Sequence, residues 1–348
     1  MSLTNRGKIT IAVLAVAFVL VGVGALALTG NAPAPIQRLV DTFVEPRPDP
    51  CPLTGVVQQG DGDVPDRPLL AIKIENSIDA RPQAGLGRAD VVYEEPVEGG
   101  LTRFIALYHC VDAKRLGPVR SARMTDIDVL AQFGRPLFGY AGGADPVKAE
   151  IAQADLVDLS YLAVDVYTRD ASRPAPHDLY TSTRALWKVG GRRGEPPAEV
   201  FTFSDELELR GKRTRLVHIP FSASSDVYWS WDRRTDRWLR AHGTTPHTTE
   251  SGEQIGADNV VVMHVAMTWG DIHDAAGNAS PEVTLTGSGR AWILRDGRTI
   301  SGRWQRRDLE DVTRFVTKSG DTIPLAPGNT WVELVPTDVT PGFSSTGA

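Results

Sequence analysis

The chain has 348 residues, of which 41% are hydrophobic and 23% charged, and its formal net charge is −6. This length and composition are typical of a globular protein with room for two domains and sizeable cores. A general nucleic-acid-binding protein normally carries a basic face, so the acidic balance argues against nucleic acid as a partner.

Residues 1–30 contain an almost entirely apolar run at positions 9–28. A helix of this length can cross a hydrocarbon core of about 30 Å. Arg6 and Lys8 precede the run, and the positive-inside rule therefore places the N-terminus in the cytoplasm. We expect a single-pass cell-membrane protein, anchored through residues 9–28, whose C-terminal body is extracytoplasmic. A cleavable signal peptide is the alternative, because residues 25–27 resemble a small-residue cleavage site.

Residues 31–50 are rich in proline and lack apolar periodicity, which predicts an extended linker. The two cysteines of the chain, Cys51 and Cys110, follow this linker. Thiols outside the cytoplasm are commonly oxidised, so we expect a disulfide between them. Such a bond would close a loop of roughly 60 residues and contribute on the order of 4 kcal/mol.

In residues 51–195, short apolar strands alternate with helical patterns, which indicates a mixed α/β domain. Strands are predicted at residues 69–75, 90–95, 101–110, 119–123 and 137–141. Helices are predicted at residues 126–133, with Thr125 as the N-cap, and at 145–154 and 183–189.

The pattern changes after residue 195, where consecutive prolines precede a segment of strands with few helical stretches. We therefore predict a second, mostly β domain at residues 196–336 and a disordered tail at 337–348. Its strands are predicted around residues 227–231, 260–267, 291–294, 299–304 and 330–335. The fold class is accordingly α+β, preceded by one transmembrane helix.

Several long motifs carry a family resemblance. They are PLTG at residues 52–55, KIENS at 73–77, RPQ at 81–83, GPVRSAR at 117–123 and SRPAPH at 172–177. With DG at 296–297, GRW at 302–304 and GNTW at 328–331, they resemble the YerB-like family of bacterial envelope proteins and lipoproteins. This family is domain of unknown function 3048, with N- and C-terminal domains. The resemblance implies an envelope location and no known reaction, and the chain departs from lipoprotein members because it has no lipobox.

A more distant resemblance concerns residues 112–143, whose order of strand, turn, strand, helix and glycine-rich turn is similar to LytR-CpsA-Psr cell-wall ligases. Those enzymes bind a polyprenyl pyrophosphate through arginines and transfer a glycan. Their acidic metal-binding motif has no match at residues 101–103, which makes the likeness an analogy.

The candidate site is a set of charged residues at strand ends and turns of the first domain. It comprises Glu94, Glu95, Arg103, Arg120, Arg123, Asp126, Arg169, Arg173 and His177, with Glu98 beside them. Arginine pairs bidentately with phosphate and carboxylate, so the cluster predicts a site for an anionic ligand. An internal network of salt bridges is the alternative, because it uses the same residue types.

Other chemistry has weaker signals. The glutamates could hold a divalent cation, but their spacing is equally typical of a solvated strand edge, so no cofactor or metal is assigned. The histidines of the second domain lack helical metal-ligand spacing. Trp229, Trp231 and Trp238 could stack on sugar rings, although aromatic residues two apart on a strand more often pack in a core.

Two functions remain open. One is an envelope protein that binds a cell-wall glycan or a phosphate-bearing ligand at the arginine-rich cleft without turnover. The other is a phosphotransferase-like enzyme that acts on a polyprenyl-pyrophosphate-linked glycan, in which Arg120, Arg123 and Arg173 hold the anion and Glu94, Glu95 or Asp126 serves a metal or a proton. The sequence favours binding slightly, because the metal motif of the ligases is missing.

Overall fold

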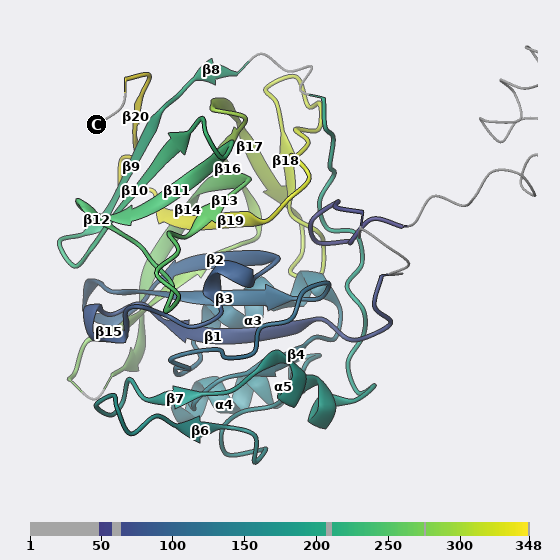
Figure 1. The fold of residues 1–348 in the computed structure, drawn as a ribbon, viewed down its shortest axis with the longest axis vertical. Coiled ribbons are helices and arrows are strands. Elements are labelled where there is room, and N and C mark those ends of the chain that lie inside the picture. Colours follow the sequence, from purple (N-terminus) through teal and green to yellow (C-terminus); the bar gives the residue numbers. More distant parts are fainter. Residues whose placement is uncertain (1–48, 58–63, 207–210, 275, 347–348) are drawn as a thin grey trace, which may run out of the picture. The chain divides into compact units, whose positions relative to one another are not determined.

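The computed structural model describes residues 49–57, 64–206, 211–274 and 276–346 (Figure 1). The predicted anchor at residues 9–28 and nearly all of the predicted linker lie outside these ranges. In the part of the chain that is described, no helix is both long and apolar enough to cross a bilayer.

The main sheet contains strands from both halves of the chain, in the order β18-β17-β16-β14-β19-β2-β3-β1-β4-β5, with β15 on β14 and β8 on β17. Its strands from the first half are β1 (Leu70–Glu75), β2 (Val91–Pro96), β3 (Thr102–Tyr108), β4 (Leu137–Gly139) and β5 (Val157–Asp158). Those from the second half are β8 (Lys212–Arg213), β14 (Asn259–His273), β15 (Ala279–Thr284), β16 (Gly287–Arg295), β17 (Arg298–Arg306), β18 (Arg314–Val316) and β19 (Thr330–Pro336).

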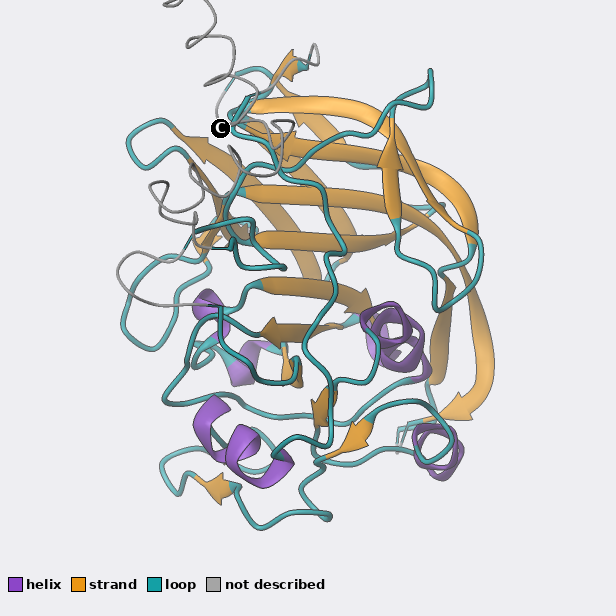
Figure 2. Cartoon of the chain, turned by 90° about the vertical axis from the view of Figure 1, so that its right-hand side faces the viewer, coloured by secondary structure: helices purple, strands orange, loops and turns teal. Residues whose placement is uncertain are grey.

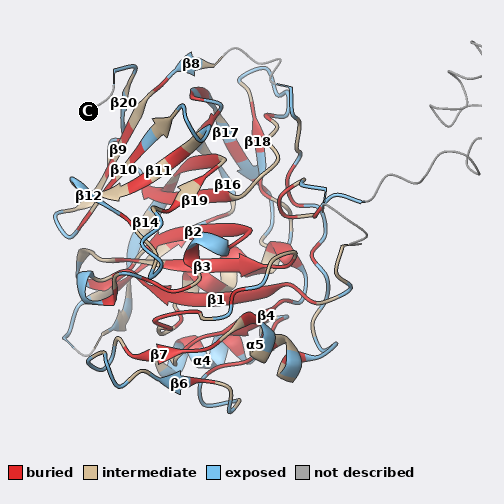
Figure 3. Ribbon diagram, viewed as in Figure 1, coloured by how far each residue is buried: buried red, intermediate tan, exposed pale blue. Residues whose placement is uncertain are grey.

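The two halves meet where β19 pairs in parallel with β2, from Thr330 opposite Val91 to Glu333 opposite Glu94. On its other side β19 pairs in parallel with β14. Every residue of β19 is buried, and all of them except Thr330 and Glu333 are apolar, as expected of a strand buried on both faces; Figure 3 shows the central strands buried. Residues from Pro50 onward therefore form one compact unit, with a sheet that runs across the boundary predicted at residue 195.

A second sheet covers one face of the main sheet. It has the order β12-β11-β10-β9-β20, with β13 on β11. Its strands are β9 (Leu216–Ser222), β10 (Ser225–Asp232), β11 (Arg237–His242), β12 (Thr245–Pro246), β13 (Gly256–Ala257) and β20 (Gly342–Ser344). A separate two-stranded sheet joins β6 (Thr168–Arg169) and β7 (Leu179–Tyr180).

The C-terminal segment departs from the expectation of disorder at residues 337–348. Gly342–Ser344 instead form β20, which pairs with the edge strand β9. An edge strand offers unpaired backbone groups, and Phe343 also packs against Trp292, with ring centroids 5.3 Å apart. These two contacts order a segment that its composition alone predicts to be disordered.

Helices are few, as the α+β prediction requires. They are α3 (Met124–Leu130), α4 (Asp145–Ile151) and α5 (Thr183–Gly190), with short 3-10 turns η1 (Ile78–Ala80), η2 (Leu86–Arg88), η3 (Glu98–Gly100) and η4 (Ala131–Phe133). Helix α3 begins one residue before the predicted N-cap Thr125, because the Asp126 carboxylate accepts a bond of 2.6 Å from the Arg123 amide. This interaction caps the first turn in place of Thr125.

Two apolar cores lie on opposite faces of the main sheet. One packs α3 and α4 against residues such as Tyr93, Ile105 and Val332. The other lies between the main sheet, α5 and the second sheet, and includes Trp229 and Trp238. Figure 2 shows the helices gathered in the lower half of the molecule, where the long curved strands reach down beside two of them. Strands of the first half thus have α3 and α4 on one face, and α5 and the second sheet on the other.

Candidate functional site

Three arginines of the predicted cluster line one cavity of about 510 Å³, together with Glu98. Arg103 lies on β3, whereas Arg120 and Arg123 lie on the segment that leads into α3. This segment is held in place on both sides, because the Arg120 amide donates to Lys73 O (2.9 Å) and its carbonyl accepts from the Ala141 amide (2.9 Å). These backbone hydrogen bonds therefore fix the positions from which the arginine side chains extend.

Two of the three guanidinium groups have an acidic partner. Arg123 forms a bidentate pair with Glu98, at 2.6 and 2.5 Å. The Arg120 Nε atom lies 3.2 Å from a carboxylate oxygen of Glu75, and Arg103 donates to the Ser121 carbonyl at 3.1 Å. Burial first, and then the nearby Arg123 and Arg120 guanidinium groups, lower the pKa of Arg103 to about 10. Among the described residues that line the cavity, three guanidinium groups stand beside the two carboxylates of Glu98 and Asp274, and this excess of positive charge suits the cavity to an anion.

His177 does not line this cavity but contacts Glu75, which faces Arg120. Its Nδ1 atom lies 2.9 Å from Glu75 Oε2, while the other oxygen of Glu75 faces Arg120. Ser77 also donates a hydrogen bond of 2.9 Å to Glu75. The sequence predicts His177 in the same cleft as the arginines, and the structure connects it to that cleft through Glu75.

Arg169 and Arg173 lie away from the cavity. Arg173 donates to the carbonyl oxygens of Asp79, Arg81 and Pro82 and to the Tyr180 hydroxyl, at 2.6 to 3.2 Å. Arg169 pairs with Asp178 at 2.7 Å and is half exposed. The guanidinium group of Arg173 is thus engaged in holding its own loop against residues 79–82. Arg173 does not line the cavity, whereas Arg103 does.

Glu95 and Asp126 form a buried cluster with Lys73, which sequence reasoning missed. All three side chains are fully buried, and Lys73 Nζ contacts Glu95 and lies 2.6 Å from Asp126. Burial and the neighbouring Asp126 raise the pKa of Glu95 to about 7, although Lys73 opposes this shift. A lysine in the middle of the apolar run of β1 is the signal that identifies this cluster, because a buried ammonium requires carboxylate partners.

Glu94 belongs to a different network, on the opposite face of the same strand. It accepts hydrogen bonds from Thr102 (2.6 Å), Asn76 (3.2 Å) and the fully buried Arg240 (2.6 Å) of the second half. Burial, and then the proximity of Glu94, raise the pKa of Glu333 well above its usual range. The network ties the two halves together, and nothing in it reaches the arginine cavity.

The histidines near this network stay neutral. Arg240 contacts His242 and His247 at 2.9 and 2.8 Å, and burial, followed by the charge of Arg240, lowers the pKa of both.

Cys51 and Cys110 form the predicted disulfide. Within the described ranges, one group of side chains is spaced closely enough to hold a metal ion, and it consists of the two cysteines and His109. The two sulfur atoms are already bonded to each other.

The tryptophans of the second half pack as core residues. Trp229 and Trp238 have no exposed surface, and Trp231 packs against Trp238 with ring centroids 5.4 Å apart. The prediction that they are cross-strand packing residues is therefore confirmed for Trp229 and Trp238, and neither can stack on a ligand.

Comparison with known proteins accounts for most of the chain. Residues 53–195 match the N-terminal domain of "Protein of unknown function (DUF3048)", and residues 217–332 match its C-terminal domain. The protein "Putative lipoprotein YerB" of Bacillus subtilis (strain 168) is 25% identical over 295 residues, which cover 82% of this chain and 86% of that protein. The crystal structure of the YerB protein from Bacillus subtilis matches with a TM-score of 0.71 at 24% identity, over 84% of this chain and 99% of that chain.

Proposed function

Because this chain belongs to the DUF3048 family, as its motifs predict, we propose that it is an envelope-associated protein that binds an anionic ligand in the arginine cavity. The name of the Bacillus relative describes a lipoprotein, which supports association with a membrane. The apolar run at residues 9–28 supports the same placement with a different means of attachment. The body of the protein then meets its ligand outside the cytoplasm.

The observation that carries the proposal is the convergence of Arg103, Arg120 and Arg123 on one cavity of about 510 Å³. A network that served only the fold would pair each guanidinium group with a carboxylate. Here Arg103 donates to a backbone carbonyl, and its pKa is lowered by burial and by its arginine neighbours. A phosphate or carboxylate that entered the cavity would accept hydrogen bonds from preplaced donors.

We favour binding over turnover on the positions of the acidic groups. The alternative, a phosphotransferase-like enzyme acting on a polyprenyl-pyrophosphate-linked glycan, needs a carboxylate that reaches the bound anion. Glu95 and Asp126 are fully buried and form ion pairs with Lys73, and Glu94 is fully buried and forms an ion pair with Arg240. Two carboxylates line the cavity itself, and both are engaged. Glu98 pairs with Arg123, and Asp274 accepts hydrogen bonds from the amides of Ala276 and Asn278 and from the Asn278 side chain, at 2.8 to 3.0 Å.

The proposal is tested by calorimetric titration of the full chain with inorganic pyrophosphate as a probe. We expect saturable binding that weakens by about tenfold or more in Arg120→Gln and Arg103→Gln, since a hydrogen bond to a charged group contributes about 1.5–3 kcal/mol. Arg169→Gln is the matched control, because Arg169 pairs with Asp178 outside the cavity. Absence of saturable binding, or equal affinity of Arg120→Gln and the unchanged chain, would contradict the proposal.

A further inference from the structure

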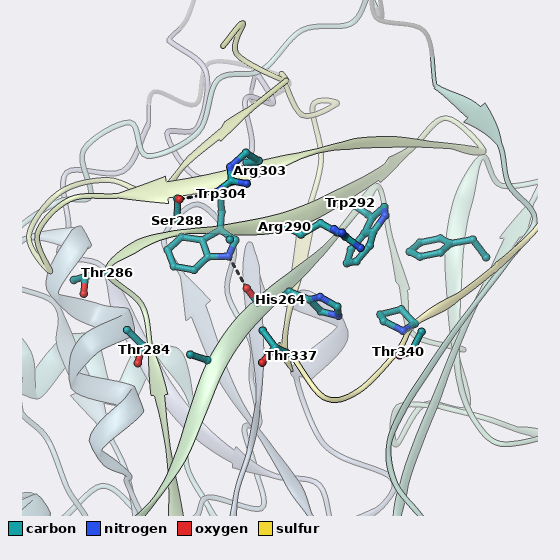
Figure 4. Close-up of a pocket in the computed structure, with 14 residues that line it drawn as sticks. His264, Thr284, Thr286, Ser288, Arg290, Trp292, Arg303, Trp304, Thr337 and Thr340 are labelled. Atoms are coloured by element: carbon teal, nitrogen blue, oxygen red, sulfur yellow. Dashed lines mark hydrogen bonds between the residues drawn. The ribbon is translucent and has the colours of Figure 1, made fainter. Parts of the chain in front are cut away.

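A second hollow, of about 730 Å³, lies in the β-rich half and shares no lining residue with the arginine cavity. It is lined by β14, β15, β16 and β17 and by residues 337–343, which include the start of β20. We call it the tryptophan groove. Figure 4 shows Trp292 and Thr340 on one side of it, Thr284 and Thr286 on the other, and Thr337 between them.

The groove has an aromatic wall. Trp292 is half buried, and Phe343, at 37% exposed, tilts against it with ring centroids 5.3 Å apart. His264 meets Trp292 edge-on at 4.8 Å, and the Nε1 atom of the buried Trp304 donates to the His264 carbonyl at 2.7 Å. These contacts fix the rings in place while part of their surface stays open to solvent. An immobilised, partly exposed ring is suited to stacking on an apolar ligand face.

The groove is also lined by threonine hydroxyl groups. Thr284, Thr286, Thr337 and Thr340 all line it. Within the described part of the chain, none of these four hydroxyls forms a hydrogen bond with another protein group. They are therefore available to a ligand that itself carries many hydroxyl groups.

The charge of the groove is positive. Arg290 and Arg303 are exposed cross-strand partners on β16 and β17, an arrangement that is destabilising for like charges. Neither arginine forms an ion pair with a described carboxylate, and no Asp or Glu is among the described lining residues. Arg290 lies over the Trp292 ring at 5.6 Å, and Arg303 donates to Ser288 at 2.8 Å. Such a conflict with local pairing rules is expected at a functional surface.

We propose that the tryptophan groove binds an acidic saccharide, in which sugar rings carry carboxylate or phosphate groups. Trp292 and Phe343 stack on the C–H face of a ring, the threonine hydroxyls bond to the sugar hydroxyls, and Arg290 and Arg303 pair with the anionic groups. This site is separate from the arginine cavity, and its ligand is recognised by aromatic, hydroxyl and cationic groups together.

The test is calorimetric titration of the full chain with tetragalacturonate, at low and moderate salt. We expect saturable binding that weakens by about threefold to tenfold in Trp292→Ala, because this substitution removes the ring on which the sugar stacks. The Arg290→Gln/Arg303→Gln double variant should weaken binding to a similar extent and reduce its salt dependence. The neutral tetramer of N-acetylglucosamine should bind several-fold more weakly than tetragalacturonate.

Three controls separate this site from other effects. Trp269→Ala removes a 62%-exposed tryptophan of β14 that lies outside the groove, and it should leave binding unchanged. Phe343→Ser serves as a second groove variant if Trp292→Ala does not fold. Arg120→Gln should weaken pyrophosphate binding and leave saccharide binding intact, so failure at one site is distinguishable from failure at the other.

Three results would overturn the inference. These are no saturable heat with tetragalacturonate, equal affinity in the groove variants and the unchanged chain, or binding of tetraglutamate as tight as that of the saccharide. The last result would show a site for negative charge alone.

Discussion

Lys73 shows how a single residue can hold a buried ionic cluster together. Its ammonium group is fully buried and contacts Glu95 and Asp126. Removal of one partner from a buried ionic cluster is far more costly than loss of an exposed pair, because the remaining charges have no water to stabilise them. The cluster therefore fixes β1, β2 and α3 relative to one another.

Lys73→Met should lower the free energy of unfolding by about 3–5 kcal/mol, since it leaves two buried carboxylates without a cation. Urea denaturation followed by tryptophan fluorescence measures this loss. Arg192→Met is the control, because Arg192 and Asp66 form a pair with side chains 83% and 71% exposed, whose loss should change stability by less than about 1 kcal/mol. Equal effects of the two substitutions would contradict the prediction.

The raised pKa of Glu95 predicts that the stability of the fold depends on pH. Burial and Asp126 raise its pKa to about 7, above the value of about 4.3 in an unfolded chain. Between these values the folded state binds more protons, so this contribution is fully present below about pH 4 and is lost as the pH rises through about 7.

Glu95→Gln should therefore reduce the fall in the free energy of unfolding between pH 5 and pH 8, by an amount on the order of 3 kcal/mol. Denaturation curves at the two pH values test this. An equally steep fall in the variant would show that Glu95 does not titrate in this range.

The candidate site could be predicted only in part from single residues. The arginines of residues 103, 120 and 123 do line one cavity, as their places at a strand end and a turn suggest. Glu94 and Glu95 do not share a site, because adjacent residues on a strand point to opposite faces. The pairing of Glu94 with Arg240, 146 positions away, depends on how the halves meet and has no local signal.

Elements were predictable where apolar periodicity was long. The expected strands at residues 69–75, 90–95 and 101–110 correspond closely to β1, β2 and β3, and α5 matches the expected helix at 183–189. The strand predicted at residues 119–123 is wrong: Val119 forms one isolated bridge with Ile74, and the following residues lead into α3. That stretch has strand-like composition, but its backbone bonds go to separate partners, and those partners place Arg120 and Arg123 at the cavity.

The hairpin of β16 and β17 depends on a glycine for its close packing. A Cβ atom on Gly289 would lie 2.3 Å from Trp304 Nε1 and 2.5 Å from the His264 carbonyl. Gly289→Ala should therefore lower the free energy of unfolding by about 1–3 kcal/mol and perturb the near-ultraviolet circular dichroism of the tryptophans.

Gly143→Ala is the matched control, because its nearest contact would be an ordinary 3.6 Å. Stability that is unaffected at both positions would contradict the predicted clash at Gly289.

At the scale of the whole molecule, the decisive feature is the position of β19 between β14 and β2. Parallel pairing on both sides buries this strand completely. The mostly β character of residues 196–336 is evident from the sequence, but the insertion of β19 beside β2 is not, because strand order depends on contacts between distant segments.

We expect the folded body to unfold in a single cooperative transition, with coincident curves by far-ultraviolet circular dichroism and tryptophan fluorescence. Residues 50–195 expressed alone should lack a stable fold, since β2 would lose its β19 neighbour and expose an apolar edge. Dispersed amide resonances from that fragment would show that the halves fold independently.

The central place of β19 also imposes an order on biogenesis. A ribosome makes residues 330–336 long after β2 and also after β14, yet the sheet needs them between these two strands. Until they emerge, β2 and β14 each present an unsatisfied apolar edge to any neighbouring chain. A nascent copy must therefore hold β2 and β14 without their shared neighbour until β19 emerges, and during that interval its need for protection by a chaperone is greatest.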